Sequence, residues 1–414
     1  MAKAIIIGGG IIGLTSAFYL KKTGWNVTII DKGDLSDNCS YGNAGMIVPS
    51  HFVPLAAPGM IEQGIRWMFN SKSPFYVRPS LNTSLLSWGL KFVKSASKQH
   101  VEKTARPLTD ISLFSKALFK ELELELDNFG LQENGILMLY KTAKVEEEEM
   151  HLAEKAKRLG LDVEVLSADA CSKLQPKLDI DIKGAVHYKC DAHLYPYKLM
   201  PLLIRYLEES GVKILRNKEV DKIRTSGSKI TSVCSGNEEF TADEYILAGG
   251  SWSPGIAKLA GLKMPLMPGK GYSFMIEEPQ KRMHIPAILC EARVAVTPMN
   301  GSIRLGGTME IDKINNKINM ARVKGIVEST SKYFPQLKPA MPAIESVWYG
   351  FRPCSPDGIP YIGRVNSYQN LVVATGHGMM GISLGPGTGK LISEILNHQK
   401  PSLETDIYSP SRYF

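Results

Sequence analysis

Three glycines near the start of the chain have the spacing of a phosphate-binding turn. Gly8, Gly10 and Gly13 form a G-x-G-x-x-G pattern. The first glycine permits a tight turn, the second lets a pyrophosphate approach the backbone, and the third allows a helix to pack closely on a strand. Asp31 ends the next apolar run, where its carboxylate can accept hydrogen bonds from ribose hydroxyls. The pattern predicts a dinucleotide site, and the acid argues against the 2′-phosphate of NADP.

A second set of residues that could do chemistry lies toward the other end of the chain. The planar guanidinium of Arg352 can hold a carboxylate through two parallel hydrogen bonds, although a structural ion pair is the alternative. Residues 376–389 are too rich in glycine to form packed core, so we expect this loop to lay its backbone against a flat ring. A helix predicted to begin near Thr388 would point its positive end at that ring. A plain structural turn is the alternative for this loop.

The elements that must position these residues begin with a β-α-β unit. Lys3–Ile7 is an apolar, β-branched strand, Leu14–Leu20 is a helix, and Asn26–Ile30 is a second strand. Such a unit implies a parallel sheet with a right-handed crossover. We also expect helices over 116–126, 145–159 and 197–210, and strands over 212–215 and 244–248.

The order of these elements predicts two domains that interrupt each other in the sequence. Residues 263–345 alternate short apolar runs with Gly and Pro turns, which indicates an antiparallel sheet. The predicted fold class is α/β (α+β overall), with a Rossmann-like cofactor-binding domain and an inserted substrate domain built on the antiparallel sheet. The cofactor-binding domain is assigned residues 1–50, 191–262 and 346–414. The substrate-binding domain is assigned residues 51–190 and 263–345.

The composition is that of an ordinary globular protein. Of the 414 residues, 44% are hydrophobic and 22% are charged, which excludes disorder, collagen and a disulfide-stabilised miniprotein. The net charge is +8, but the basic residues are scattered along the chain rather than clustered, so no nucleic-acid partner is predicted. None of the six cysteines has metal-ligand spacing, so we expect free thiols, a reducing compartment and no metal site. Without a recognisable targeting signal, the predicted location is the cytoplasm.

Four segments together resemble the D-amino acid oxidase superfamily of FAD-dependent amine oxidoreductases. The likeness is closest to its bacterial D-amino acid dehydrogenase subgroup and runs from residue 1 to about residue 398. Besides the N-terminal glycines, the segments are Ser40-Tyr41-Gly42-Asn43-Ala44-Gly45-Met46 with Pro54-Leu55-Ala56-Ala57-Pro58-Gly59, Gly350-Phe351-Arg352-Pro353 continuing to Pro356-Asp357-Gly358, and Ala374-Thr375-Gly376-His377-Gly378-Met379 leading into Gly385-Pro386-Gly387-Thr388-Gly389.

The resemblance implies that the cofactor is FAD. Val220 is expected to hold the adenine side through its backbone, and Ala248-Gly249 to end a strand near the pyrophosphate. Monomeric sarcosine oxidases in the superfamily bind flavin through a cysteine, but Cys354 is out of place for that bond, so we predict noncovalent FAD. The full set of expected cofactor contacts is Gly8, Gly10, Ile11, Ile12, Gly13, Asp31, Lys32, Ser40, Asn43, Ala44, Gly45, Met46, Val220, Ala248, Gly249, Gly350, Gly378, Met379, Met380 and Gly381.

The resemblance also implies the reaction. Arg352 is expected to bind the carboxylate of an amino acid, Tyr272 or Tyr349 to supply a second polar contact, and His51 and His377 to line the pocket. The expected activity is oxidative deamination of D-amino acids, including cyclic ones such as D-proline. Hydride passes from the α-carbon to flavin N5, and electrons pass on to an external acceptor such as a quinone. The alternatives are an oxygen-using glycine or sarcosine oxidase and a non-catalytic flavin-binding subunit.

Two apolar stretches bear on where the protein resides. Trp67-Met68-Phe69 and Leu86 to Val93 fit either buried core or a patch for peripheral contact with the inner membrane. The sequence leaves the oligomeric state open.

Overall fold

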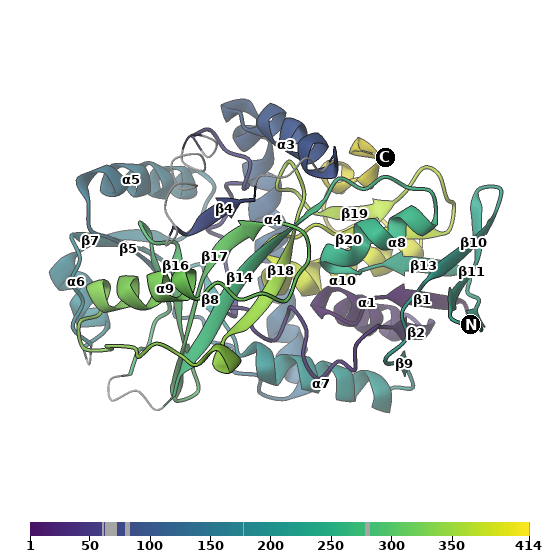
Figure 1. The fold of residues 1–414 in the computed structure, drawn as a ribbon, viewed down its shortest axis with the longest axis horizontal. Coiled ribbons are helices and arrows are strands. Elements are labelled where there is room, and N and C mark those ends of the chain that lie inside the picture. The colour runs from purple at the N-terminus through teal and green to yellow at the C-terminus, as the bar shows by residue number, and fades with distance from the viewer. Residues whose placement is uncertain (60–61, 63–72, 79–82, 177, 278–281, 414) are drawn as a thin grey trace.

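Two sheets lie side by side in the computed structural model (Figure 1). The model describes residues 1–413 except 60–61, 63–72, 79–82, 177 and 278–281. Trp67-Met68-Phe69 therefore lies outside the described residues. Among the described helices, none is long and apolar enough to cross a membrane.

The six-stranded sheet carries the G-x-G-x-x-G turn. Its order is β19-β20-β13-β1-β2-β9, and neighbours are parallel except β19 with β20. The N-terminal β-α-β prediction is confirmed. The strands are β1 (Lys3–Ile7), β2 (Asn26–Ile30), β9 (Lys213–Leu215), β13 (Glu244–Leu247), β19 (Tyr361–Arg364) and β20 (Leu371–Thr375).

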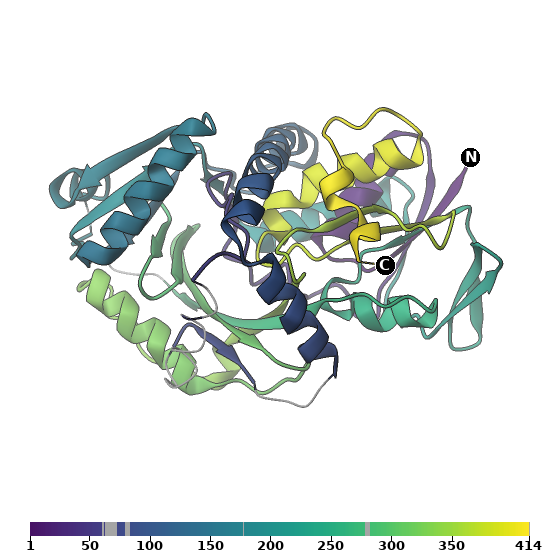
Figure 2. The ribbon, with the colours of Figure 1, turned by 90° about the horizontal axis from the view of Figure 1, so that it is seen from above.

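Both faces of this sheet are covered, as expected for parallel strands made of consecutive apolar residues. Ile6 packs into the core beneath the helices on one face, while its neighbours Ile5 and Ile7 pack into a separate core on the other. Figure 2 shows α4 and α10 lying together on the first of these faces. The covering helices are α1 (Ile11–Lys22), α4 (Lys98–Leu126), α7 (Pro196–Glu209) and α10 (Gly381–Leu396) on the first face and α8 (Ser253–Leu259) on the second.

The glycine-rich segment differs from its prediction. Helix α10 begins at Gly381 rather than near Thr388, so residues 381–389 are packed helix and not part of the predicted glycine-rich loop. A side chain at Gly385 would meet Ile11 of α1 at 2.8 Å, and one at Gly389 would meet the backbone of Thr15 at 2.5 Å. The glycines therefore permit close packing of α10 on α1. From the sequence alone, glycines at such a helix contact cannot be told from glycines in a loop.

The second sheet is mixed and mainly antiparallel, with the order β18-β14-β17-β16-β15-β5-β7-β6 and β4 added to β17. The antiparallel sheet predicted for 263–345 forms here from β14 to β17. The strands are β4 (Phe75–Val77), β5 (Ile136–Tyr140), β6 (Val163–Ser167), β7 (Gly184–Tyr188), β14 (Met267–Ile276), β15 (Ala287–Leu289), β16 (Val294–Met299), β17 (Ser302–Ile311) and β18 (Trp348–Cys354).

Two elements depart from the domain boundaries assigned from the sequence. Strand β18 pairs with β14 in the second sheet, although it was assigned to the cofactor-binding domain. Helix α4 packs on α10 beneath the first sheet, although it was assigned to the substrate-binding domain. Both elements belong to the other domain because long-range strand pairing and helix packing, rather than chain order, determine where a segment lies.

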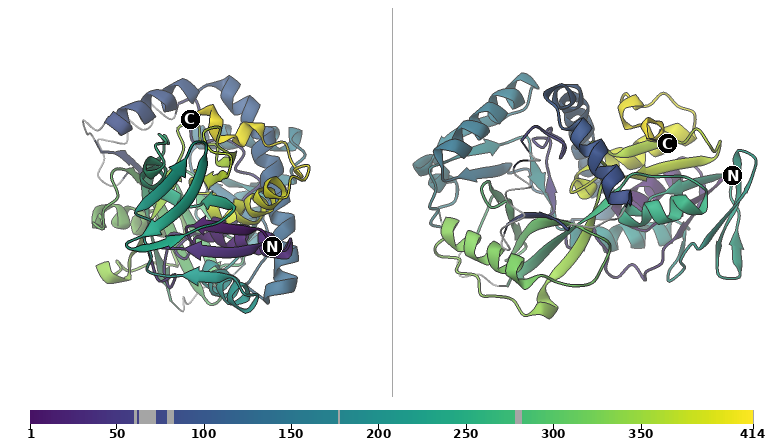
Figure 3. Two further views of the ribbon diagram at one scale, coloured as in Figure 1. Left: turned by 90° about the vertical axis from the view of Figure 1, so that its right-hand side faces the viewer. Right: turned by 45° about the horizontal axis from the view of Figure 1, so that its top comes forward.

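The remaining elements complete the two ends of the molecule. Helices α5 and α6 pack on β6 and β7, and α9 packs on β15–β17. A separate meander projects beside the N-terminus (Figures 1 and 3). These elements are β3 (Met46–Ile47) with β8 (Ala192–His193), α3 (Thr83–Ser95), α5 (Ala143–Arg158), α6 (Ala168–Leu174), α9 (Met320–Tyr333), the meander β10 (Lys222–Ser226), β11 (Lys229–Ser235) and β12 (Glu238–Phe240), and the 3₁₀ turns η1 (Gly250–Trp252), η2 (Ile344–Ser346), η3 (Asp406–Tyr408) and η4 (Pro410–Arg412).

Candidate functional site

The fingerprint glycines lie where β1 passes into α1. Gly8 has φ +115°, and a side chain there would meet the carbonyl oxygen of Ala248 at 2.4 Å. A side chain at Gly13 would meet the carbonyl oxygen of Gly8 at 1.9 Å, so only glycine fits these two positions. Gly10 is different, because the nearest atom to an added Cβ is Ser40 Oγ at 3.7 Å. Gly10 thus leaves an open approach to the N-terminus of α1, as a pyrophosphate requires.

Asp31 follows β2 and shapes the same turn. Its Oδ2 accepts a hydrogen bond from the backbone N–H of Gly9 at 2.6 Å, and its Oδ1 accepts one from Gly33 N–H at 2.7 Å. A carboxylate oxygen has more than one lone pair, so Asp31 retains acceptor capacity for ribose hydroxyls. The ammonium of Lys32 lies 4.0 Å from the centre of the Trp252 ring beside it.

The loop from Ser40 to Met46 lies across the start of α1. Ser40 Oγ accepts a hydrogen bond from Ile11 N–H at 3.1 Å. Arg304 of β17 holds the loop from the other sheet, because its Nη1 donates to the carbonyls of Tyr41 at 2.6 Å and Asn43 at 2.7 Å. No local pattern identifies Arg304 in advance, because its role depends on the strand pairing that places β17 next to this loop.

A continuous cavity of about 1370 Å³ joins these parts. Pockets for small ligands usually measure about 300–1,000 Å³, so this one has room for a dinucleotide together with a small substrate. All the predicted cofactor and substrate residues line it except Gly13 and Gly45, which lie behind its wall. The glycine turn, the acid after β2 and the open approach at Gly10 together fit the phosphates and ribose of FAD.

The N-terminus of α10 reaches the cavity opposite the fingerprint. Gly376 and Gly378 have φ values of +82° and +55°, and the turn they make brings Gly381 and the residues before it to the cavity wall. His377 is 96% buried and its Nε2 is 3.0 Å from Thr388 Oγ1 within α10. Burial lowers the pKa of His377 to about 3, so its ring stays neutral. His377 therefore fixes the turn to the helix.

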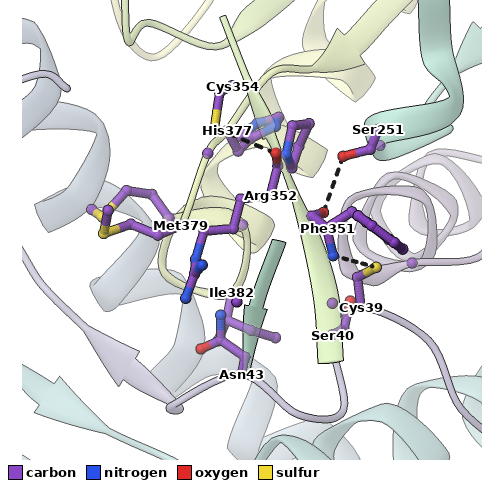
Figure 4. Close-up of a pocket in the computed structure, with 18 of the residues that line it drawn as sticks. Cys39, Ser40, Asn43, Ser251, Phe351, Arg352, Cys354, His377, Met379 and Ile382 are labelled. Carbon is purple, nitrogen blue, oxygen red and sulfur yellow. Dashed lines mark hydrogen bonds between the residues drawn. The ribbon is translucent and has the colours of Figure 1, made fainter. Parts of the chain in front are cut away.

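Arg352 lies on β18 with its guanidinium directed to the side of the pocket where Met379 and Asn43 lie (Figure 4). Its side chain passes over Gly271 of β14, where an added Cβ would meet Nη1 at 2.0 Å. Nη1 donates to the carbonyl of Thr308 at 2.7 Å, and no carboxylate within the described part of the chain pairs with the guanidinium. Burial lowers the pKa of Arg352. Among the described residues, Arg352 is thus a partly buried cation without an anionic partner, which does not favour the structural ion pair.

Thr308, whose carbonyl accepts the hydrogen bond from Arg352, has a strained backbone conformation. Its φ is +65°, a value that β-branched residues rarely adopt, and the pairing of β14 with β17 is irregular opposite it. The irregularity brings the Thr308 carbonyl to Arg352. Strain of this kind persists where surrounding structure enforces it and is common at ligand sites.

The two candidate tyrosines differ in the structure. The Tyr272 hydroxyl donates to Glu310 Oε2 at 3.0 Å and accepts from the backbone N–H of Asn319 at 3.2 Å. These two partners engage the hydroxyl, while Tyr272 itself lines the cavity. Its role as a polar contact to the substrate stays a prediction. Tyr349 lies on β18 two residues before Phe351 and packs edge-on against it at 5.8 Å. Tyr349 also remains a predicted second contact.

His51 lines the cavity at the end of a short hydrogen-bonded chain. Its Nδ1 is 3.2 Å from Ser50 Oγ, which donates to Asp191 Oδ2 at 2.5 Å. Asp191 is fully buried. Sequence reasoning did not find Asp191, because only the pairing of β3 with β8 brings its turn to Ser50.

Comparison with known proteins gives a family and a fold. A family model described as FAD dependent oxidoreductase (DAO) matches residues 3–395. The chain is 30% identical over 413 residues to a D-amino acid dehydrogenase of Helicobacter pylori, covering 100% of this chain and 99% of the relative. It is 28% identical over 417 residues to a D-amino acid dehydrogenase of Dechloromonas aromatica (strain RCB), covering 97% and 98%.

Solved structures share the whole architecture. Glycine oxidase from Geobacillus kaustophilus matches with a TM-score of 0.81 at 22% identity, with 100% of both chains covered. L-proline dehydrogenase from P. horikoshii matches with a TM-score of 0.77 at 21% identity, covering 100% of this chain and 97% of that one. At these identities the likeness shows the fold, and the predicted fold class is confirmed.

Proposed function

Because the chain belongs to the family of FAD-dependent oxidoreductases, we propose that it catalyses the oxidative deamination of D-amino acids. The observation that carries the substrate class is Arg352, a guanidinium on the cavity wall that has no carboxylate partner among the described residues. A partly buried cation on a cavity wall without an anion nearby is favourably placed to pair with a ligand carboxylate. The names of the D-amino acid dehydrogenase relatives support the D configuration.

The chain's own residues bind, orient and desolvate the substrate. Arg352 holds the carboxylate and thereby fixes the direction of the α-carbon, which reduces the entropy cost of reaching the reactive geometry. The N-terminus of α10 directs unpaired N–H groups and a positive dipole end into the cavity, where they stabilise negative charge. When bound, FAD supplies the two-electron acceptor for the hydrogen that leaves the α-carbon. The imino acid product hydrolyses to a 2-oxo acid and ammonia.

An anaerobic substrate screen tests the proposal. FAD-loaded protein is mixed with D-amino acids including D-proline, with their L-enantiomers, and with glycine and sarcosine, while absorbance is followed near ~450 nm, a property of oxidised flavin. We expect D-amino acids to bleach the flavin and to yield one imino or 2-oxo acid per flavin. Faster bleaching by glycine or sarcosine, with peroxide in air, would support the oxidase alternative. No bleaching by any amine would support a non-catalytic subunit.

We expect the flavin to be held without a covalent bond. The cysteines that line the cavity are Cys39 and Cys354, and burial raises the pKa of both thiols, that of Cys354 to about 12. The thiolate is the nucleophilic form of cysteine, so neither side chain is poised to attack a ring. Precipitation with acid should release all flavin fluorescence to the supernatant. Flavin retained in the washed pellet would contradict this prediction.

If the external acceptor is a membrane quinone, the protein would bind peripherally at the cytoplasmic face of the membrane. The exposed apolar side chains of helix α3 support this location. Leu86, Leu90 and Val93 share one helix face and are 56%, 74% and 55% exposed, so the buried-core alternative fails for them. It holds for Trp88, whose indole N–H donates to the carbonyl of Cys354 at 2.9 Å. Lysines at positions 91 and 94 lie next to this exposed face and suit an anionic bilayer.

The membrane proposal predicts binding to anionic vesicles. We expect the protein to sediment with vesicles at low salt, and the variant Leu86→Ser/Leu90→Ser/Val93→Ser to bind at least about tenfold more weakly, since each buried leucine contributes about 1.5–3 kcal/mol when fully covered. Leu124→Ser is the matched control, because Leu124 is 89% exposed on α4, away from α3. Wild-type protein that stays in the supernatant would contradict the proposal.

A further inference from the structure

We propose that Ser50 and Asp191 are positioning residues that set the tautomer of His51, so that its Nε2 accepts a hydrogen bond from the substrate's amino group only while Asp191 is ionised. This inference rests on the proposed function and deepens it, because it concerns the group that holds the amine while Arg352 holds the carboxylate. It assigns a positioning role to Ser50, which lines the cavity beside His51, and to Asp191, which lies behind the cavity wall.

The chain of hydrogen bonds is fixed at both ends by the backbone. Asp191 lies in the turn between β7 and β8, and Ser50 follows β3, which pairs with β8. Ser50 N–H donates to Asp191 Oδ1 at 3.0 Å, and Ser50 Oγ donates to Oδ2 at 2.5 Å. Ser50 Oγ is also 3.2 Å from His51 Nδ1. A serine hydroxyl has one hydrogen, so these contacts have a defined direction.

The direction of the chain depends on the proton of Asp191. When Asp191 is ionised, its Oδ2 accepts the only hydrogen of Ser50, and Ser50 Oγ must accept from Nδ1–H of His51. His51 Nε2 is then an unprotonated acceptor. When Asp191 is protonated, it can donate to Ser50, which turns its own hydrogen toward Nδ1. His51 then carries its proton on Nε2 and opposes the N–H groups of an amine. No bond to carbon or nitrogen is made or broken by this change.

The charges around the chain allow the switch near neutral pH. Burial raises the pKa of Asp191 to about 7, although Ser50 counteracts this. Burial and the nearby Arg293 lower the pKa of His51 to about 4, so the ring stays neutral and only its tautomer changes. Rising pH through about 7 therefore favours the accepting form.

The other ionisable groups near the hydrogen-bonded chain come from five elements or turns. They do not replace Asp191 in the hydrogen-bonded path, since none of them bonds to Ser50 Oγ or His51 among the described contacts. They are Lys116 of α4, which donates to the carbonyl of Cys190 at 2.8 Å, Cys190 itself at 3.5 Å from Asp191 Oδ1, Tyr188 of β7, Arg293 of the β15–β16 turn, and Glu149 of α5.

The first test is the pH dependence of anaerobic flavin bleaching by a D-amino acid. In wild-type protein we expect the rate at fixed low substrate to rise about tenfold across neutral pH, as expected for a hydrogen bond worth about 1.5 kcal/mol. In Asp191→Asn the amide donates to Ser50, so His51 is fixed in the wrong tautomer, and the rate stays at the low level at every pH. Ser50→Ala breaks the path and should also lose the rise. Asp181→Asn, an exposed partner of Lys141, is the matched control and keeps it.

A second readout does not use activity. In FAD-loaded protein labelled with ¹⁵N in histidine, His51 should carry its proton on Nδ1 above pH 7 and on Nε2 below it, while Asp191→Asn carries it on Nε2 throughout. A rise in rate with the same midpoint in Asp191→Asn or Ser50→Ala, or one tautomer of His51 at all pH values, would overturn the inference. Should no amine bleach wild-type protein, the proposed function fails, and the tautomer measurement still decides the inference.

Discussion

Replacement of Arg352 by alanine is expected to raise KM for a D-amino acid about 100-fold while FAD remains bound. The lost interaction is a desolvated pair of two charge-assisted hydrogen bonds, worth about 3 kcal/mol, and each ~1.4 kcal/mol corresponds to a factor of ten. FAD should stay because the cavity contacts expected for it come mostly from other segments, from the fingerprint to α10. Steady-state kinetics with an artificial acceptor, together with the flavin-to-protein absorbance ratio, measures both effects.

Two further variants make this result specific. Arg352→Lys keeps the charge but loses the two parallel bonds, so we expect about a tenfold rise in KM. Arg158→Ala removes an exposed arginine at the end of α5 and should leave KM unchanged. If Arg352→Ala leaves KM for carboxylate substrates unchanged, the carboxylate contact is wrong.

Substitution of Gly10 by valine is expected to produce folded protein that lacks FAD. The nearest atom to an added Cβ at Gly10 is 3.7 Å away, so the apoprotein has room for the side chain. The same side chain occupies the approach of the pyrophosphate to the N-terminus of α1 and removes hydrogen bonds to charged oxygens worth about 1.5–3 kcal/mol each. We expect FAD affinity to fall at least about 100-fold, as measured by titration of apoprotein.

The control for this variant lies in a different helix. Gly89 of α3 likewise has room for a side chain, with nothing within 4 Å of an added Cβ, and Gly89→Val should bind FAD normally. Thermal unfolding of the two apoproteins separates a binding defect from a folding defect. Normal FAD content in Gly10→Val would show that the cofactor does not use this turn.

Local motifs were predictable and long-range partners were not. The turn at Gly8, Gly10 and Gly13 could be predicted because the spacing of its glycines, strand and helix lies within one β-α-β unit. Arg304 and Asp191 reach the site through strand pairings between distant segments, and the local spacing of residues in the sequence does not predict such pairings. For the same reason β18 could not be assigned to the second sheet from its position in the chain.

Glycine content was ambiguous in one segment. Glycines let a backbone lie against a ligand, but they also let two helices approach closely, and a sequence without its partner helix does not separate the two. Gly376 and Gly378 make the turn at the cavity, whereas Gly385 and Gly389 pack against α1. The hydrogen bond of Tyr272 could not be predicted for the same reason, because its partner Glu310 lies on a neighbouring strand.

A crystal structure of the FAD-loaded protein with an unreactive small carboxylate tests the central claim most directly. We expect both carboxylate oxygens to bind the guanidinium of Arg352, with the isoalloxazine ring against the turn that leads into α10. A carboxylate bound away from Arg352, or a ring system absent from that turn, would contradict it.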